Sequence, residues 1–173
     1  MTSLKIATAA AFLGFLVAGS PVVLAETPDA KSQTELASAL KGAKVSLEKG
    51  LAASAREGKP ISAKFEVEDG KLQLSAYTAK GGKFSEVIVD HETGKVAKTE
   101  PITAGEDLAA AKEQSETMAK AKLSLAAATK KALTENKGFR AVSVTPLTKD
   151  GHPVADVTLL KGEEFKTASE KLD

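Results

Sequence analysis

The residues best suited to chemistry in this chain are gathered in one short segment, Asp90-His91-Glu92. A histidine between two carboxylates offers metal ligands or an acid–base pair. However, three adjacent turn residues cannot all point at one ion, and the only other histidine, His152, belongs to a different turn of the chain. We therefore predict a solvated turn whose aspartate accepts backbone hydrogen bonds, and neither a metal site nor any other cofactor.

Other catalytic patterns are missing from the sequence. No Gly-x-Ser-x-Gly nucleophile motif occurs, and Lys130 and Lys131 stand side by side in a predicted helix, as solvated charges commonly do. The string Lys80-Gly81-Gly82-Lys83 lacks the spacing and context of a phosphate-binding loop and predicts a hairpin turn instead. We therefore expect that the protein is not an enzyme.

Residues 1–25 have the features of a secretory signal peptide. Lys5 is their only charged residue, a short apolar run follows, and Val23-Leu24-Ala25 offers small residues at the cleavage-specificity positions. The apolar run is shorter than the ~20 residues needed to span a bilayer. We predict cleavage after Ala25, a periplasmic or secreted bacterial protein, and no membrane attachment once the signal is removed.

Charge and cysteine content narrow the partners. The chain has 24 Lys and Arg against 23 Asp and Glu, and loss of Lys5 makes the mature protein formally neutral. Such a balance does not provide the basic surface of a nucleic-acid-binding or membrane-surface protein. There is no cysteine, so folding depends on apolar burial without disulfides. The partner classes that fit this composition are proteins and small molecules. The sequence does not indicate the oligomeric state.

Two parts of the mature chain repeat each other. The repeated strings are Ala43-Lys44-Val45-Ser46-Leu47 with Ala121-Lys122-Leu123-Ser124-Leu125, Asp69-Gly70 with Asp150-Gly151, Lys80-Gly81 with Lys161-Gly162, and Phe84 with Phe165. Such repetition indicates a duplicated structural unit. We predict a first unit at residues 26–101 and a second at residues 102–173. Half of the mature chain alone would be marginally stable, so the two units are expected to touch.

Each unit is predicted to be a helix followed by an antiparallel meander. Apolar residues at steps of three and four predict one helix over 36–55 and another over 108–132. Capping-box spacing precedes both helices, at Ser32-x-x-Glu35 and Thr103-x-x-Glu106. Alternating patterns separated by Gly-containing turns predict strands near 61–67, 72–76, 84–89 and 96–99.

The second meander differs from the first in composition. Pro146 predicts an edge position or a bulge, because proline cannot donate to a strand ladder. Val154 and Leu160 make one strand apolar on both faces, and we expect their face to meet the other unit. We therefore expect the second unit to be a truncated copy that lacks the closing turn of the first.

One helix, a meander with an acidic-Gly turn, and the closing string Val89-Asp90-x-x-Thr93-Gly94-Lys95-Val96 resemble the PepSY family. The resemblance covers residues 40–100. It extends to 103–173 through Asp150-Gly151, Phe165 and the order of elements. It implies an α+β, cystatin-like fold in two tandem units, each a helix packed on a three- to four-stranded antiparallel meander. The family occurs in propeptides of thermolysin-like metallopeptidases and in exported bacterial proteins. It is thought to bind or restrain peptidases and has no known catalytic residues.

We therefore expect an exported, non-enzymatic binding protein that engages a periplasmic peptidase or another cell-envelope protein through sheet faces or strand edges. Candidate partner-binding residues are Tyr77 on the polar face of its strand and Asp90, Thr93, Gly94 and Lys95 in the closing turn. The other explanation of Tyr77, and the one that we favour, is ordinary packing against a neighbouring strand or a long lysine side chain. The alternative function is a small-ligand or metal carrier with a cavity between helix and sheet.

Overall fold

The computed structural model describes residues 30–173; the predicted signal peptide, with cleavage after Ala25, lies outside them. The elements are α1 (Ala30–Ala39), the 3-10 helix η1 (Leu40–Gly42), α2 (Leu47–Ser54), β1 (Lys59–Glu68), β2 (Lys71–Lys80), β3 (Lys83–Val89), β4 (Val96–Ile102), α3 (Gly105–Lys120), α4 (Leu125–Glu135), β5 (Arg140–Lys149), β6 (His152–Lys161) and β7 (Glu164–Lys171). None of the described helices is long and apolar enough to cross a bilayer.

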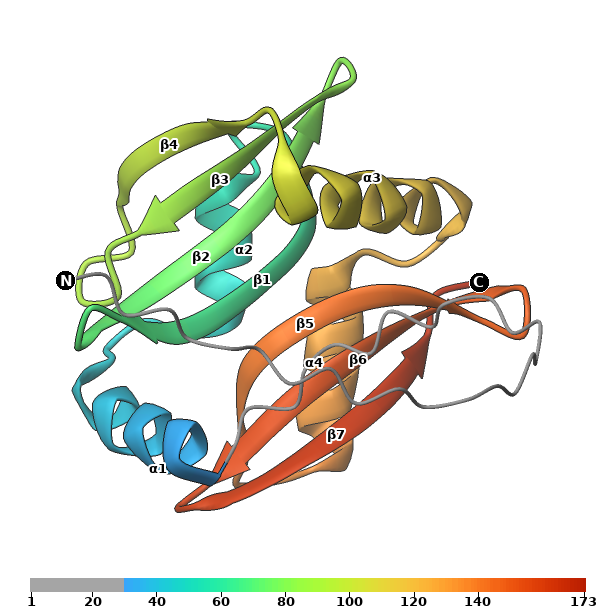
Figure 1. Ribbon diagram of the computed structural model, residues 1–173. Helices are drawn as coiled ribbons and strands as arrows, with labels where there is room; N and C mark the ends of the chain where they lie inside the picture. The colour runs from blue at the N-terminus through green and yellow to red at the C-terminus, as the bar shows by residue number, and fades with distance from the viewer. Residues whose placement is uncertain (1–29) are drawn as a thin grey trace, which may run out of the picture.

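All seven strands form one antiparallel sheet in the order β4-β3-β2-β1-β5-β6-β7 (Figure 1). The two meanders meet where β1 pairs with β5, and the ladder between them has only two residue pairs, Ala63 with Val144 and Lys64 with Ser143. Within each meander the pairing is far longer. The expected two tandem helix-on-meander units are therefore wrong, because the meanders share a single sheet and four helices pack on it.

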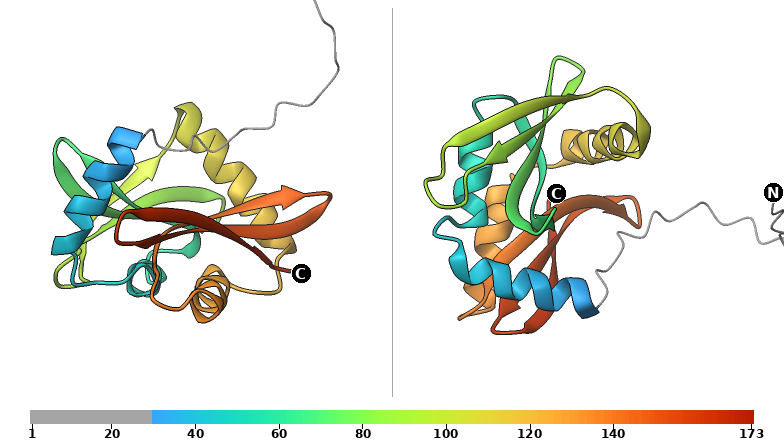
Figure 2. Two further views of the ribbon diagram at one scale, coloured as in Figure 1. Left: turned by 90° about the horizontal axis from the view of Figure 1, so that it is seen from below. Right: turned by 60° about the vertical axis from the view of Figure 1, so that its left-hand side comes forward.

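The sheet has α2 and α4 on the same face (Figure 2, left). Side chains alternate along a strand, so every second residue of a strand lies on this face. Among these residues are the buried side chains of Leu74 and Ala76 on β2 and of Val157 on β6. Gly50 of α2 lies so close to Leu74 that a Cβ there would be 2.7 Å from the leucine side chain. Close packing of the two helices on this face gives the main core.

Helices α1 and α3 lie near opposite ends of the short ladder between β1 and β5 (Figure 1). Lys59, at the start of β1, donates to the Met118 carbonyl of α3 at 2.8 Å, and Thr148, near the end of β5, lies 3.2 Å from Thr117 of α3. On the other side, Arg140 at the start of β5 donates to the Leu40 carbonyl at 2.8 Å. These contacts join the meanders where direct strand pairing has ended.

Both predicted helices are broken at the repeated string. The first helix stops at Gly42 and a new one begins at Leu47; the second stops at Lys120 and restarts at Leu125. Ser46 and Ser124 cap the restarted helices by accepting hydrogen bonds from Lys49 N and Ala127 N at 3.3 and 3.2 Å.

The predicted capping boxes are not the helix starts. Helix α1 begins at Ala30, before Ser32, and the N-cap of α3 is Ala104, which has no side-chain cap bond.

The predicted hairpin turns are confirmed. Both turn residues have positive φ at Asp69-Gly70, Gly81-Gly82 and Asp150-Gly151, which is the two-residue turn that suits the twist of a hairpin. Pro146 pairs with Ala155 of β6 and lies beyond the short β1–β5 ladder. An N–H at this position would have no partner on β1, so the proline costs no strand hydrogen bond. Val154 and Leu160 are buried, at 7% and 4% exposure.

Candidate functional site

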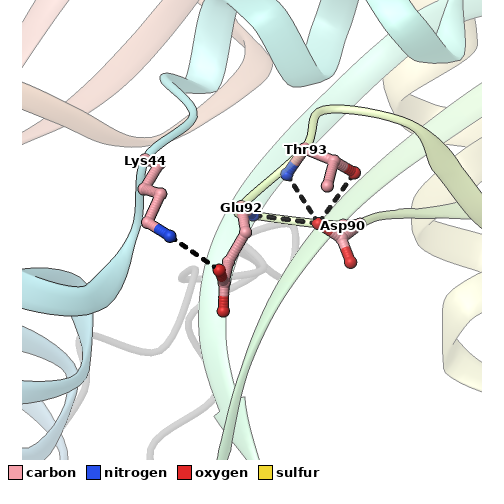
Figure 3. Close-up of polar contacts among 4 residues, drawn as sticks. All are labelled: Lys44, Asp90, Glu92 and Thr93. Carbon is pink, nitrogen blue, oxygen red and sulfur yellow. Dashed lines mark hydrogen bonds and ion pairs between the residues drawn. The ribbon is translucent and has the colours of Figure 1, made fainter.

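The closing turn of the first meander is organised by one carboxylate. Asp90 Oδ1 accepts hydrogen bonds from Thr93 N at 2.7 Å, Thr93 Oγ1 at 2.9 Å and Glu92 N at 3.0 Å (Figure 3). These donors, those of Thr93 first, lower the pKa of Asp90. Gly94 has a φ of 75° and donates to the Asp90 carbonyl at 2.8 Å, which closes the turn.

The same turn is attached to the break between η1 and α2. The His91 carbonyl accepts Lys44 N at 2.9 Å and Val45 N at 3.0 Å. Lys44 Nζ also lies 2.9 Å from Glu92 Oε2, and this hydrogen-bonded pair raises the pKa of Lys44 and lowers that of Glu92 (Figure 3). All four predicted partner-binding residues of this turn thus make contacts within the chain: Asp90, Thr93, Gly94 and Lys95. The Lys95 carbonyl accepts Asp90 N at 2.9 Å, and Lys95 N donates to Thr93 Oγ1 at 3.4 Å.

The second half has an equivalent attachment that the sequence analysis missed. The Leu172 carbonyl accepts Lys122 N at 2.7 Å and Leu123 N at 3.0 Å, and Leu172 N donates to the Pro153 carbonyl at 3.0 Å. The Leu172 carbonyl therefore accepts two N–H groups just before α4, as the His91 carbonyl accepts two N–H groups just before α2. Repetition of the Ala-Lys-x-Ser-Leu string was the signal that could have revealed this equivalence.

Tyr77 is partly buried and packs against the core. Lys64 Nζ lies 5.9 Å from the centre of its ring. Burial raises the pKa of the Tyr77 hydroxyl well above its usual range, and the negative charge of Glu86 adds to the effect. Packing between neighbouring side chains accounts for the position of Tyr77.

Within residues 30–173, no group of three or more His, Cys, Asp or Glu side chains is arranged to hold a metal ion. His91 Nδ1 is buried and has no hydrogen-bond partner in this part of the chain. A hollow of about 390 Å³ beside the closing turn and another of about 250 Å³ beside the β5–β6 hairpin are lined mainly by polar residues. Both lie at hairpin ends rather than between a helix and the sheet.

The sheet ends in β4 and β7, and no other described segment pairs with their outer sides. In a two-residue hairpin the residues flanking the turn exchange hydrogen bonds, and bonding then alternates along the strand. For the β6–β7 hairpin, the flanking pair is Lys161 and Glu164, so even-numbered residues of β7 bond to β6. The bond from Leu172 N to Pro153 O agrees with this alternation.

The outer edge of β7 therefore presents a regular row of unpaired backbone groups. They belong to Phe165, Thr167, Ser169 and Lys171. The same reasoning places Thr99 and Pro101 on the outer side of β4, opposite Val87 and Ser85. Pro101 has no N–H to offer, and the β3–β4 ladder is further interrupted by a register shift after Ile88.

The fold and this edge define an α+β protein with one seven-stranded antiparallel sheet and an open row of strand donors and acceptors on β7. No known protein family, no curated protein and no solved structure matches the chain. The resemblance to the PepSY family therefore remains a prediction from the sequence.

Proposed function

We propose that this is an exported, non-enzymatic binding protein that takes an extended segment of a cell-envelope protein as an additional strand on β7. The observation that carries the proposal is the row of outward backbone groups from Phe165 to Lys171, which no described segment covers. Strand addition derives affinity from main-chain hydrogen bonds, so it needs no specialised side chain.

Several features favour β7 over β4 as the binding edge. β7 is eight residues long and has no proline, whereas β4 has seven residues and contains Pro101. An inward-pointing charge on an edge strand usually discourages pairing, and β7 has one in Glu170. However, Glu170 is already paired with Lys131 at 2.5 Å, so its charge is compensated within the chain.

A peptidase is the first class of partner to test. The sequence resemblance implies it, and an exposed strand edge is a surface to which an extended segment of another protein can bind. The partner's remaining contacts would come from side chains flanking the edge, such as Phe165 and Lys171.

The test uses a single proline on each edge. Thr167→Pro removes one outward N–H of β7 without removing a bond to β6, and Thr99→Pro makes the same change on β4 as a matched control. Mature wild-type protein and both variants are used to capture partners from a periplasmic extract of the source organism, and retained proteins are identified and assayed for peptidase activity.

We expect Thr167→Pro to lose a partner that the wild type and Thr99→Pro retain. In the purified complex, hydrogen exchange should slow at the amides of Thr167 and Ser169. Capture that is equal for all three proteins, or no capture by the wild type, contradicts the proposal.

A further inference from the structure

The charges along β7 are complementary to their own reversed order. On the face that α4 covers, β7 places Lys166, Ala168 and Glu170 in sequence. An antiparallel copy of the strand, centred on Ala168, puts Lys166 opposite Glu170 and Glu170 opposite Lys166. Opposite charges directly across an antiparallel pair are stabilising, and like charges are destabilising.

We propose that two copies of this chain pair β7 with β7, antiparallel and about Ala168, so that two seven-stranded sheets become one. The inference rests on the same open edge as the proposed function, but it names a second copy of the chain as the occupant. Self-pairing and partner binding would then compete for β7.

Backbone geometry permits this register. Its outward residues pair as Thr167 with Ser169 and Phe165 with Lys171, so that each pair exchanges two backbone hydrogen bonds. Sliding one strand by two residues in one direction places Glu164 opposite Glu170, two like charges. Sliding it in the other direction places Glu170 opposite Ala168 and shortens the overlap. Of these registers, the one centred on Ala168 places each of the two charges opposite a charge of the other sign.

The helices leave room for the second copy. A two-fold axis perpendicular to the sheet relates antiparallel neighbours, so both α4 helices lie on the same face. The two β6 strands would be three strand spacings apart, about 14 Å. Packed helices need only about 8–10 Å between their axes. Since α4 packs on β5, β6 and β7, the two copies of α4 can lie beside each other without overlap.

Both charged side chains lie on the α4 face of β7 and contact residues of their own chain. Lys166 Nζ lies 5.2 Å from the centre of the Phe139 ring and 2.5 Å from Asn136 Oδ1, which holds the lysine on the α4 face. Glu170 is 3% exposed, and its partner Lys131 is about half exposed. A single strand pair makes a small interface, so we expect a weak, concentration-dependent dimer.

Sedimentation equilibrium of the mature chain tests the inference. We expect a monomer–dimer equilibrium for the wild type and for Thr99→Pro, and a monomer for Thr167→Pro. Lys166→Glu places glutamates opposite each other twice, and its dimer should dissociate about tenfold more readily. Mixing Lys166→Glu with Glu170→Lys should restore association as a heterodimer, because each charged pair is then again opposite in sign.

A wild type that stays monomeric at high concentration, or a Lys166→Glu variant that dimerises as well as the wild type, overturns the inference. If Glu170→Lys fails to fold by circular dichroism, Lys166→Glu and Thr167→Pro decide the matter. A monomeric wild type that still loses its captured partner on Thr167→Pro overturns self-pairing alone. A dimer with no partner sensitive to Thr167→Pro overturns the proposed function alone.

Discussion

Replacing Leu172 with alanine tests whether the Leu172 side chain is part of the core. Leu172 is the second-last residue, yet its side chain is 0% exposed. Its backbone carbonyl holds the start of α4 through Lys122 and Leu123, and its N–H bonds to Pro153. Leu172→Ala keeps all three backbone bonds and removes only the buried side chain, so its effect measures packing.

The expected cost follows from that burial. Leu→Ala in a protein core costs about 2–5 kcal/mol, and the lower part of this range applies where the surroundings can relax. Leu172 directly follows the edge strand β7, where the surroundings can relax, so we expect a loss of about 2–3 kcal/mol in the free energy of unfolding. For a domain of this size each kcal/mol shifts the melting temperature by roughly 3 °C. The variant should therefore melt about 6–9 °C below the wild type.

Leu123→Ala is the matched control. It is the same chemical change at a residue in direct backbone contact with Leu172, but the Leu123 side chain is 42% exposed. We expect it to cost less than about 0.5 kcal/mol. Urea denaturation and calorimetry measure both variants. Equal losses for Leu172→Ala and Leu123→Ala would refute the conclusion that the C-terminus completes the core.

Further predictions concern the helix caps and the closing turn. Ser46→Ala and Ser124→Ala should each lower the free energy of unfolding by about 1 kcal/mol in urea titrations, whereas Thr103→Ala, outside the α3 N-cap, should stay near the wild type. The folded-state pKa of Asp90 is lowered, so its stabilisation is present above the usual pKa of about 3.9 and is lost as pH falls through the folded pKa. The stability advantage of the wild type over Asp90→Asn should therefore shrink below about pH 4; a pH-independent difference would contradict the assignment.

The two helix breaks show where periodicity alone was insufficient. Leu40, Ala43 and Leu47 have helical spacing, and a continuous helix satisfies it as well as an interrupted one does. The break is favoured by a residue far along the chain: the N–H groups of Lys44 and Val45 bond to the His91 carbonyl. Spacing within one segment cannot reveal a bond to another.

The partner-binding prediction for the closing turn had a similar limit. The sequence analysis gave Asp90 a role in accepting backbone hydrogen bonds, and the structure shows two such bonds to its Oδ1, with a third bond from the Thr93 hydroxyl. It did not show that the turn attaches to the start of α2 through His91 and Glu92. The sequence analysis also did not identify β7 as an open edge of the sheet. Hairpin signals predict which consecutive strands pair, but they do not predict the order of all strands in the sheet.

The sequence by itself determined the local geometry: the alternating strands, the positive-φ turns at Asp69-Gly70 and Asp150-Gly151, and the repeated order of elements. These depend on side-chain alternation and on which residues tolerate positive φ, both of which are properties of neighbouring residues. Tertiary structure alone decided that β1 pairs with β5, that Leu172 completes the core and that β4 and β7 form the edges. Those features depend on burial and hydrogen bonding between distant segments, and one meander cannot specify them without the other.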